Sequence, residues 1–361
     1  MRTTAAGPDL AIELRKEDTV VREGASGVSK EMEAVCIRSP GGPEVLELRA
    51  VSRPDPGKGE VRVRVAASGV NRADLLQRKG LYPAPSGYPQ EIPGLEFSGK
   101  VEAVGPGSRL WKVGDPVMGI IAGGGYARFV VVEERTLVRV PRDHSPAEAA
   151  AIPEAFMTAF DALFLQAELG VGETVLIHAV GSGVGTAGLQ LALEAGATVL
   201  GTSRTPEKLD RAREMGLHHG FVGRGDWAAE VAEVTGGSGA DVILDLVGGP
   251  YLTGNQHAIA ERGRHVVVGV PGGRRIEVDL RRLMQKRAVV RGTVLRARPS
   301  EEKVRLARVF ERRIVPLFER GSLHPVLDRT YAPADAPDAH RLLEENRSFG
   351  KALLLWGDDD R

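Results

Sequence analysis

Between residues 174 and about 295, short apolar runs alternate with stretches in which apolar residues recur every three or four positions. The short runs are rich in β-branched residues, which is typical of strands buried on both faces, and the longer spacing is typical of helices. The pattern predicts strands at 174–180, 198–202, 219–222, 240–247, 264–270 and 288–295. It predicts helices between them, notably at 184–194, 207–215, 227–234 and 251–261. Strands joined by helices in this way indicate an α/β fold with a doubly wound parallel sheet.

A different pattern flanks this region on both sides. Upstream, Val61, Val63 and Val65 alternate with Arg62 and Arg64, as on a strand with one buried face. Upstream strands are predicted at 34–37, 45–51 and 60–66, and helices at 146–152 and 155–166. Downstream, an amphipathic helix is predicted at 301–319, and strands at 326–331 and 352–355 around a helix at 337–345. We therefore expect the C-terminal part to return to the first domain, which gives a β-rich domain at 32–153 and 297–361 and a central domain at 154–296.

Closely spaced glycines follow the first strand of the central region. They are Gly181, Gly183 and Gly185, with Ser182 and Val184 between them. Glycines between a strand and a helix let the backbone approach a pyrophosphate, and the free amides of the helix hold its charge. The motif GxGxxG would need a third glycine at 186, where the chain has Thr186. The flanking strands and helix favour a dinucleotide site; the alternative is a tight turn without a ligand.

The end of the second central strand bears on which nicotinamide dinucleotide binds. An acidic residue there would hold the ribose 2′-hydroxyl of NAD, but no acid occurs before Glu207. Arg204 and Lys208 can pair with a 2′-phosphate, and Ser203 and Thr205 add hydroxyl groups. We therefore predict NADPH as the cofactor. The alternative is that Arg204 and Lys208 belong to a solvated helix start.

Composition restricts the partners of the protein. The 361 residues include 48 basic and 48 acidic side chains, so no net field attracts nucleic acid or an acidic membrane. The single cysteine, Cys36, excludes internal disulfides and a multi-cysteine zinc site. No apolar run approaches the ~20 residues of a membrane span, so we expect a cytoplasmic protein. Residues 1–31 lack a sustained period and are predicted to be a disordered extension, or residues upstream of a natural start at Met32.

Several stretches from residue 32 to 356 resemble a known family. They read VNRADLLQR at 70–78, GLY at 80–82, PGLE at 93–96, GDPV at 114–117, AIPEA at 151–155, TAF at 158–160, DLVGG at 245–249, and Asn346 with Gly350-Lys351. With the glycine turn, they are similar to zinc-free medium-chain dehydrogenase/reductases, specifically quinone oxidoreductases of the zeta-crystallin kind. The nearest branch is the p53-inducible quinone oxidoreductase-like one. The resemblance implies a Rossmann sheet for the cofactor and a β-rich GroES-like domain.

The resemblance also bears on metal binding. In zinc-dependent alcohol dehydrogenases of this superfamily, a cysteine stands at the position of Asn71 and a histidine at that of Leu95. An amide and an isobutyl group do not replace a thiolate and an imidazole as zinc ligands, and Glu96 alone makes no site. We therefore expect no metal.

The site residues follow partly from the resemblance and partly from the strand ends. The resemblance implies Asn71 and Tyr82 as catalytic residues in the cleft between domains, Asn71 also near the cofactor, and Thr158 beside the nicotinamide. The alternatives are that Asn71 only caps the chain, that Tyr82 packs within its loop, and that Thr158 lies on an ordinary helix surface. Further cofactor contacts are predicted at Gly248, Gly269, Arg296 and Asn346, and at Arg224, which would replace a tyrosine that relatives carry at the position of Gly223.

These features together predict an enzyme. Without a Lewis acid, the acceptor must already be electrophilic and needs orientation and a hydrogen-bond donor for its developing oxyanion. We expect NADPH-dependent hydride transfer to quinones. The alternatives are reduction of enals, enones or enoyl thioesters, and, in another class, a cofactor-binding structural or RNA-binding protein of the crystallin kind. The apolar last strand at 288–295 would be an open edge unless it pairs with a twofold mate, which predicts a homodimer.

Overall fold

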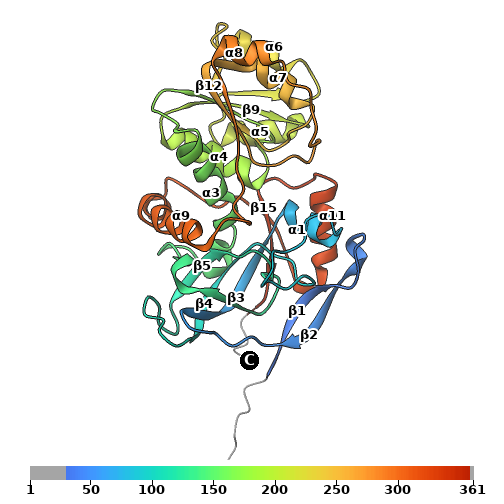
Figure 1. Cartoon of the computed structure of the whole chain (residues 1–361), viewed down its shortest axis with the longest axis vertical. Coiled ribbons are helices and arrows are strands. Elements are labelled where there is room, and N and C mark those ends of the chain that lie inside the picture. The colour runs from blue at the N-terminus through green and yellow to red at the C-terminus, as the bar shows by residue number, and fades with distance from the viewer. Residues whose placement is uncertain (1–29, 358–361) are drawn as a thin grey trace, which may run out of the picture.

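The computed structural model describes residues 30–357, so the predicted extension lies outside the described residues except for its last two positions. Two large sheets form the molecule, one above the other in Figure 1. From residue 30 the described chain first forms a two-stranded sheet and the lower sheet, then builds the upper sheet and returns to the lower one (blue, then green to orange, then red). Within residues 30–357, none of the helices has the length and apolar content that a bilayer crossing requires.

The upper sheet consists of parallel strands. They are β8 (Thr174–Ile177), β9 (Thr198–Ser203), β10 (His219–Val222), β11 (Ala240–Asp245), β12 (Ile259–Val267) and β13 (Val289–Gly292). Their order is β10-β9-β8-β11-β12-β13. The chain reverses its direction across the sheet between β8 and β11, where a doubly wound sheet opens toward its ligand. The predicted α/β class and doubly wound parallel sheet are confirmed.

Helices pack around this sheet. They are α3 (Pro153–Phe160), continued by the π-helical turn η3 (Asp161–Gln166), α4 (Gly183–Glu194), α5 (Pro206–Glu214), α6 (Trp227–Val234), α7 (Tyr251–Ala258) and α8 (Leu280–Lys286). The pattern did not predict α8. Its apolar residues, of which Leu280 and Met284 are 65% and 75% exposed, face outward rather than into the core.

Several boundaries in the upper sheet differ from the predicted ones, and two of them have a clear local cause. Strand β8 ends at Ile177 rather than at 180, because the chain turns at Ala179, whose φ is 51°. Helix α7 ends at Ala258, three residues early, because Ile259 already pairs with Ala240 as the first residue of β12. Long-range strand pairing therefore overrides the helical spacing there.

The lower sheet gathers strands from both ends of the described chain. They are β3 (Glu60–Val70), β4 (Glu96–Val104), β5 (Pro116–Ile120), β6 (Phe129–Glu133), β7 (Val138–Arg139), β14 (Leu327–Tyr331) and β15 (Lys351–Leu355), beside a two-stranded sheet of β1 (Glu31–Ile37) and β2 (Leu46–Ser52). Strand β15 pairs antiparallel with β3. We propose the domain limits given above, and the pairing of β15 with β3 supports them.

Short helices complete the lower part. They are α1 (Arg72–Arg78), α2 (Pro146–Ala149), α11 (Ala336–Glu344) and the 3-10 turns η1 (Pro43–Val45), η2 (Glu134–Thr136) and η4 (Pro333–Asp335). The helix predicted at 301–319 is two helices, α9 (Ser300–Arg313) and α10 (Val315–Glu319). Pro316 lacks the N–H that a continuous helix would need.

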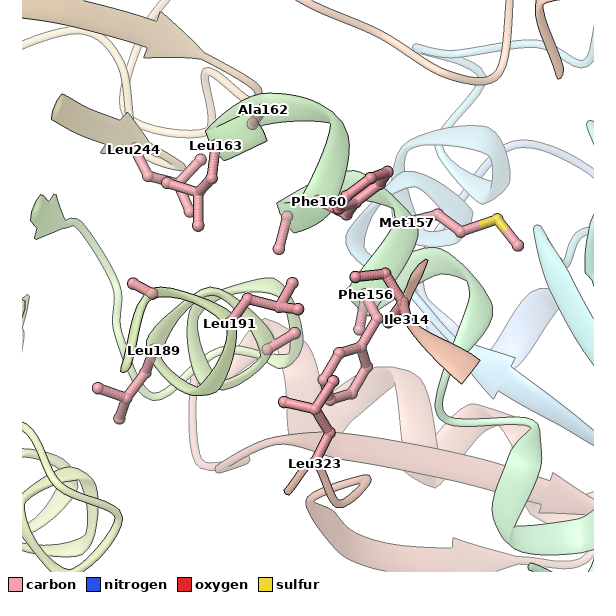
Figure 2. Packing of buried hydrophobic residues seen from close by; sticks show 14 of the residues in the cluster. Phe156, Met157, Phe160, Ala162, Leu163, Leu189, Leu191, Leu244, Ile314 and Leu323 are labelled. Carbon is pink, nitrogen blue, oxygen red and sulfur yellow. The ribbon is translucent and has the colours of Figure 1, made fainter. Parts of the chain in front are cut away.

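Helix α3 lies at the centre of the larger hydrophobic core. Figure 2 shows side chains of α3 and η3 among those of α4, β11 and the segments on either side of α10: Phe156, Met157, Phe160, Ala162, Leu163, Leu189, Leu191, Leu244, Ile314 and Leu323. Burial of each large apolar side chain contributes about 1.5–3 kcal/mol. This packing fixes the orientation of α3 and therefore of its polar residues, Glu154 and Thr158.

Candidate functional site

The turn after β8 places backbone amides at the start of α4. Ser182 caps this 12-residue helix, because its Oγ accepts a hydrogen bond from the amide of Gly185 at 3.1 Å. A Cβ at Gly185 would lie 2.4 Å from the carbonyl oxygen of Ala179, so a larger residue does not fit the turn. The positive end of α4 therefore faces the crevice of the sheet, as a pyrophosphate site requires.

The other residues of the turn lie against the C-terminal segment. The Gly350 amide donates to the Gly181 carbonyl oxygen at 2.9 Å. A Cβ at Gly183 would lie 2.5 Å from Cδ of Lys351, whose stem therefore passes directly beside the turn. Val184 is half-buried in the first turn of α4.

The glycine motif is complete, but it begins two residues later than the sequence analysis assumed. Gly183, Gly185 and Gly188 have the spacing GxGxxG. A Cβ at Gly188 would lie 2.9 Å from Cδ2 of Leu244 and 3.4 Å from Cδ1 of Ile177. The third glycine therefore allows α4 to pack closely on β8 and β11, which is its role in such motifs.

Three cationic side chains converge on one residue beside this turn. Arg72 and Arg204 both donate to Oδ1 of Asn346, and Nζ of Lys208 donates to the Asn346 carbonyl oxygen at 2.6 Å. The pKa of Lys208 lies below its usual value, first because of burial and then because of the charges of Arg204 and Arg72. Burial and the charge of Arg204 likewise lower the pKa of Arg72. The sequence analysis missed Arg72, which belongs to α1 of the lower part of the molecule.

The other residues predicted to bind the adenosine end of the cofactor lie at or just after the ends of β9 and β10. Ser203 is buried at the end of β9 and Thr205 is the residue before α5. Arg224 is exposed and forms no hydrogen bond or ion pair with the rest of residues 30–357. At Gly223 a Cβ would lie 1.9 Å from Oη of Tyr251, so the Tyr251 phenol from α7 occupies the space beside this glycine.

Gly248 and Gly269 lie just beyond the carboxyl ends of β11 and β12. The Gly248 amide donates to Oδ1 of Asp245 at 2.8 Å, which holds this turn in place. Gly269 lines a surface cavity of about 620 Å³ together with the ends of β12 and β13. Both glycines are therefore at the edge of the sheet where the predicted site opens.

Thr158, Tyr82 and Arg296 lie where the two parts of the molecule meet. The Thr158 hydroxyl is buried without a hydrogen-bond partner in the described part of the chain, which is the condition of a group that a ligand would satisfy. The Arg296 guanidinium lies 4.6 Å from the centre of the Tyr82 ring and donates to the Tyr82 carbonyl oxygen at 3.0 Å. Arg296 also donates to Ala122 and Gln77, so it holds the Tyr82 loop, and its predicted contact with the cofactor stays a prediction.

Asn71 is part of a buried network. Its Nδ2 donates to Oε1 of Glu96 at 2.9 Å and to the Gly69 carbonyl oxygen at 3.3 Å, and its Oδ1 accepts from Nζ of Lys351 at 2.6 Å. Lys351 and Glu96 form an ion pair of 2.5 Å with both side chains buried. Because the Asn71 side-chain amide already forms hydrogen bonds with Glu96 and Lys351, it orients this ion pair. The predicted contact of Asn71 with the acceptor or the cofactor stays a prediction.

These groups do not fit a zinc ion. The Lys351 ammonium is itself a cation, Leu95 is apolar and buried, and the Asn71 amide is neutral. Within residues 30–357, no three His, Cys, Asp or Glu side chains are grouped as a metal would require. The residues do fit a dinucleotide, since the turn of α4 offers free amides, the cations around Asn346 offer donors for phosphate, and the Thr158 hydroxyl lacks a partner in the described part of the chain.

Comparisons with known proteins agree with this architecture. Residues 57–142 match the alcohol dehydrogenase GroES-like domain family, and residues 183–311 match the zinc-binding dehydrogenase family. The fold is similar to a crystal structure of an NAD-dependent alcohol dehydrogenase, with TM-score 0.81 and 34% identity over 90% of this chain and 100% of that one. It is equally similar to the JamJ enoyl reductase (apo form), with TM-score 0.81 and 29% identity over 91% and 99% of the two chains.

Curated relatives are of two kinds. A phthioceranic/hydroxyphthioceranic acid synthase of Mycobacterium tuberculosis is 35% identical over 88% of this chain, which spans only 15% of the synthase. A quinone oxidoreductase of Pseudomonas aeruginosa is 36% identical over 87% of this chain and 97% of its own length. Together with the two family matches, this similarity shows that the chain belongs to the quinone oxidoreductase family of medium-chain dehydrogenase/reductases.

Proposed function

We propose that the protein uses NADPH to reduce quinones. The observation that carries the cofactor choice is the convergence of Arg72, Arg204 and Lys208 on Asn346, with no ion pair to any of the three within residues 30–357. Such a group of donors fits the dianionic 2′-phosphate of NADPH. NADH offers only a hydroxyl there, and no acid holds it.

The choice of acceptor rests on the network formed by Lys351, Glu96 and Asn71. Where a Lewis acid would polarise a carbonyl, this chain has the Lys351 ammonium, which Glu96 and Asn71 already bind. The acceptor therefore has to be electrophilic by itself, as quinones are.

Each group has a distinct part in the reaction. Bound NADPH would supply a hydride from its nicotinamide ring. The α4 turn binds the pyrophosphate, the Thr158 hydroxyl orients the nicotinamide, and Tyr82 orients the acceptor with its ring or its hydroxyl. Arg296 keeps the Tyr82 loop against the cleft.

A second candidate is reduction of the C=C bond of enals, enones or enoyl thioesters. The similarity to the JamJ enoyl reductase favours it. Both reactions deliver a hydride to a conjugated acceptor, so the same cleft serves either.

A substrate panel separates the two. NADPH oxidation is followed with 9,10-phenanthrenequinone, with alkenals and with an enoyl thioester, and each reaction is repeated with NADH. Quinone turnover that exceeds turnover of the alkenes, with NADPH preferred, supports the proposal. Preferred reduction of the alkenes would replace it with the second candidate.

We also propose that the protein is a homodimer through β13. This strand lies at the end of the upper sheet, and Val289, Val290 and Val294 are 47%, 44% and 48% exposed. An exposed apolar edge is best covered by the same strand of a second copy. Light scattering should give the mass of a dimer for the wild type and of a monomer for Val290→Arg. A monomeric wild type at micromolar concentration would exclude this arrangement.

A further inference from the structure

One acidic side chain in the cleft has no role in the reaction described so far. Glu154 lies in the first turn of α3, and Thr158 follows one turn later on the same helix face. Within residues 30–357 nothing forms a hydrogen bond or ion pair with the Glu154 carboxyl, and the Thr158 hydroxyl is equally unpartnered. Two polar groups without protein partners therefore stand together on the helix that lines the cleft.

The backbone holds Glu154 beside the lysine network. Its amide donates to Oε2 of Glu96 at 2.8 Å, while Oε1 of Glu96 accepts from Asn71 and pairs with Lys351. Because Lys351 is committed to Glu96, it does not neutralise a second carboxylate.

Burial, more than the surrounding charges, favours the protonated form of the Glu154 carboxyl at neutral pH. Burial raises its pKa to about 8, with a further contribution from Glu96 on β4 and a smaller one from Asp74 on α1. Lys351 on β15 and Arg296 act in the opposite direction without overcoming burial. The ionised form of Glu154 would in turn raise the pKa of Tyr82 and of Lys303 on α9, so Glu154 lies near the side where the acceptor is expected.

We propose that Glu154 is the proton donor of the reaction, the general acid that protonates the reduced acceptor. This inference rests on the reductase activity proposed above. The acceptor takes a hydride from NADPH, and the displaced electron pair moves to the acceptor oxygen. That oxyanion takes the proton of the Glu154 carboxyl: the carboxyl O–H bond breaks, a new O–H bond forms on the product, and the carboxylate regains a proton from water. NADPH, acceptor and one proton become NADP⁺ and the reduced acceptor.

Two other groups are weaker candidates for this step. The pKa of the Tyr82 phenol is raised above its ordinary value by burial, so it holds its proton more tightly than a carboxyl does. The Asn71 amide is too weak an acid to release a proton and is bound to Glu96 and Lys351. A general acid works best when its pKa lies near the working pH, and Glu154 meets that condition.

The first test needs no cofactor or acceptor. Infrared difference spectra of the free protein are recorded as pH rises from 5 to 10 for the wild type, Glu154→Gln and the control Glu230→Gln. Glu230 also lies in the first turn of its helix, α6, but is exposed. In the wild type we expect a carboxylic acid band that persists at neutral pH and disappears with a midpoint at a pH of about 8. The same band should be present in Glu230→Gln and missing from Glu154→Gln. Its presence in Glu154→Gln, or a wild-type midpoint below 6, would overturn the assignment.

The second test follows kcat/KM for 9,10-phenanthrenequinone against pH. For the wild type, kcat/KM should fall as pH rises through about 8, and Glu154→Asp should keep a descending limb in its pH profile. Glu154→Gln should lose that limb, and its kcat/KM at neutral pH should be about 100-fold lower than that of the wild type. NADPH affinity, measured by calorimetry, should stay the same in Glu154→Gln. An unchanged limb and rate in Glu154→Gln would refute the role. Absence of turnover in the wild type would instead count against the proposed function, and the infrared titration would still decide how Glu154 ionises.

Discussion

The three cations around Asn346 allow the cofactor proposal to be tested quantitatively. Arg72 comes from α1 and Arg204 from the end of β9, and the two guanidinium groups share Oδ1 of Asn346 as an acceptor. A 2′-phosphate would replace this single neutral oxygen with a charged group that accepts from all three cations. Alanine at Arg72 or Arg204 should therefore weaken NADPH binding and leave NADH binding unchanged.

The size of the effect follows from the exposure of these side chains. A hydrogen bond to a charged group contributes about 1.5–3 kcal/mol, and the lower end applies where solvent screens the charges. We expect about 1.5 kcal/mol, or about tenfold in Kd, for each arginine. Asn346→Asp should do more, because a carboxylate among the cations occupies the place of the phosphate: NADPH binding should fall by more than tenfold, while the free protein gains about 0.5–1 kcal/mol of stability.

The assay is isothermal titration of NADPH and NADH at two salt concentrations, with thermal unfolding of the free protein alongside. The matched control is Arg213→Ala, since Arg213 is an arginine of α5 whose exposed side chain pairs with Asp210. NADPH affinity that changes less than threefold in Arg204→Ala, or an equal loss for NADH, would refute the phosphate site. A lower melting temperature in Asn346→Asp would show that the cations do not repel one another in the free protein.

Three further predictions concern stability. Gly188→Ala should destabilise the protein by about 1–3 kcal/mol in urea unfolding, because its Cβ meets Leu244, and a neutral result would mean that α4 can shift. Arg298→Met should cost about 3–5 kcal/mol, because it leaves the buried Asp161 carboxylate without its partner at 2.7 Å; a loss under 1 kcal/mol would contradict that pairing. The pKa of Glu154, about 8, exceeds its unfolded value of 4.5, so folding favours the protonated form. The contribution of Glu154 to the free energy of unfolding is therefore full below pH 4.5 and is lost as pH rises through 8. Glu154→Gln should therefore gain about 1–2 kcal/mol relative to the wild type between pH 5 and 9, after allowance for partial exposure, and a constant difference would contradict the raised pKa.

The sequence was sufficient for features that depend on local spacing. The strands of the upper sheet follow from short β-branched runs, and Ser182 and Gly185 follow from the turn that a strand-to-helix connection needs. The incomplete motif resulted from counting from Gly181. Gly188 has no unusual backbone angle and sits within a helix, so its role appears only when its distance to Leu244 on β11 is known.

The electrostatic environment could not be predicted in the same way. Arg72 and Asn346 are separated by 274 positions, and nothing in their local sequence indicates that they meet. Glu154 was part of a matching motif, yet its protonation depends on groups from β4, β15 and α1. Such a pKa results from burial and neighbouring charges that only the assembled fold defines.

Lys351 shows how the two halves of the site depend on each other. Its stem lies beside Gly183 in the cofactor turn, and its ammonium group reaches Glu96 and Asn71 in the lower part of the molecule. The ion pair neutralises Glu96, which would otherwise be an isolated buried carboxylate and therefore costly. Lys351 lowers the pKa of Glu154 as well, but too little to offset burial, which raises that pKa to about 8. Under the proposed function, the Lys351–Glu96 ion pair is therefore compatible both with an acceptor that needs no Lewis acid and with a Glu154 carboxyl group that protonates it.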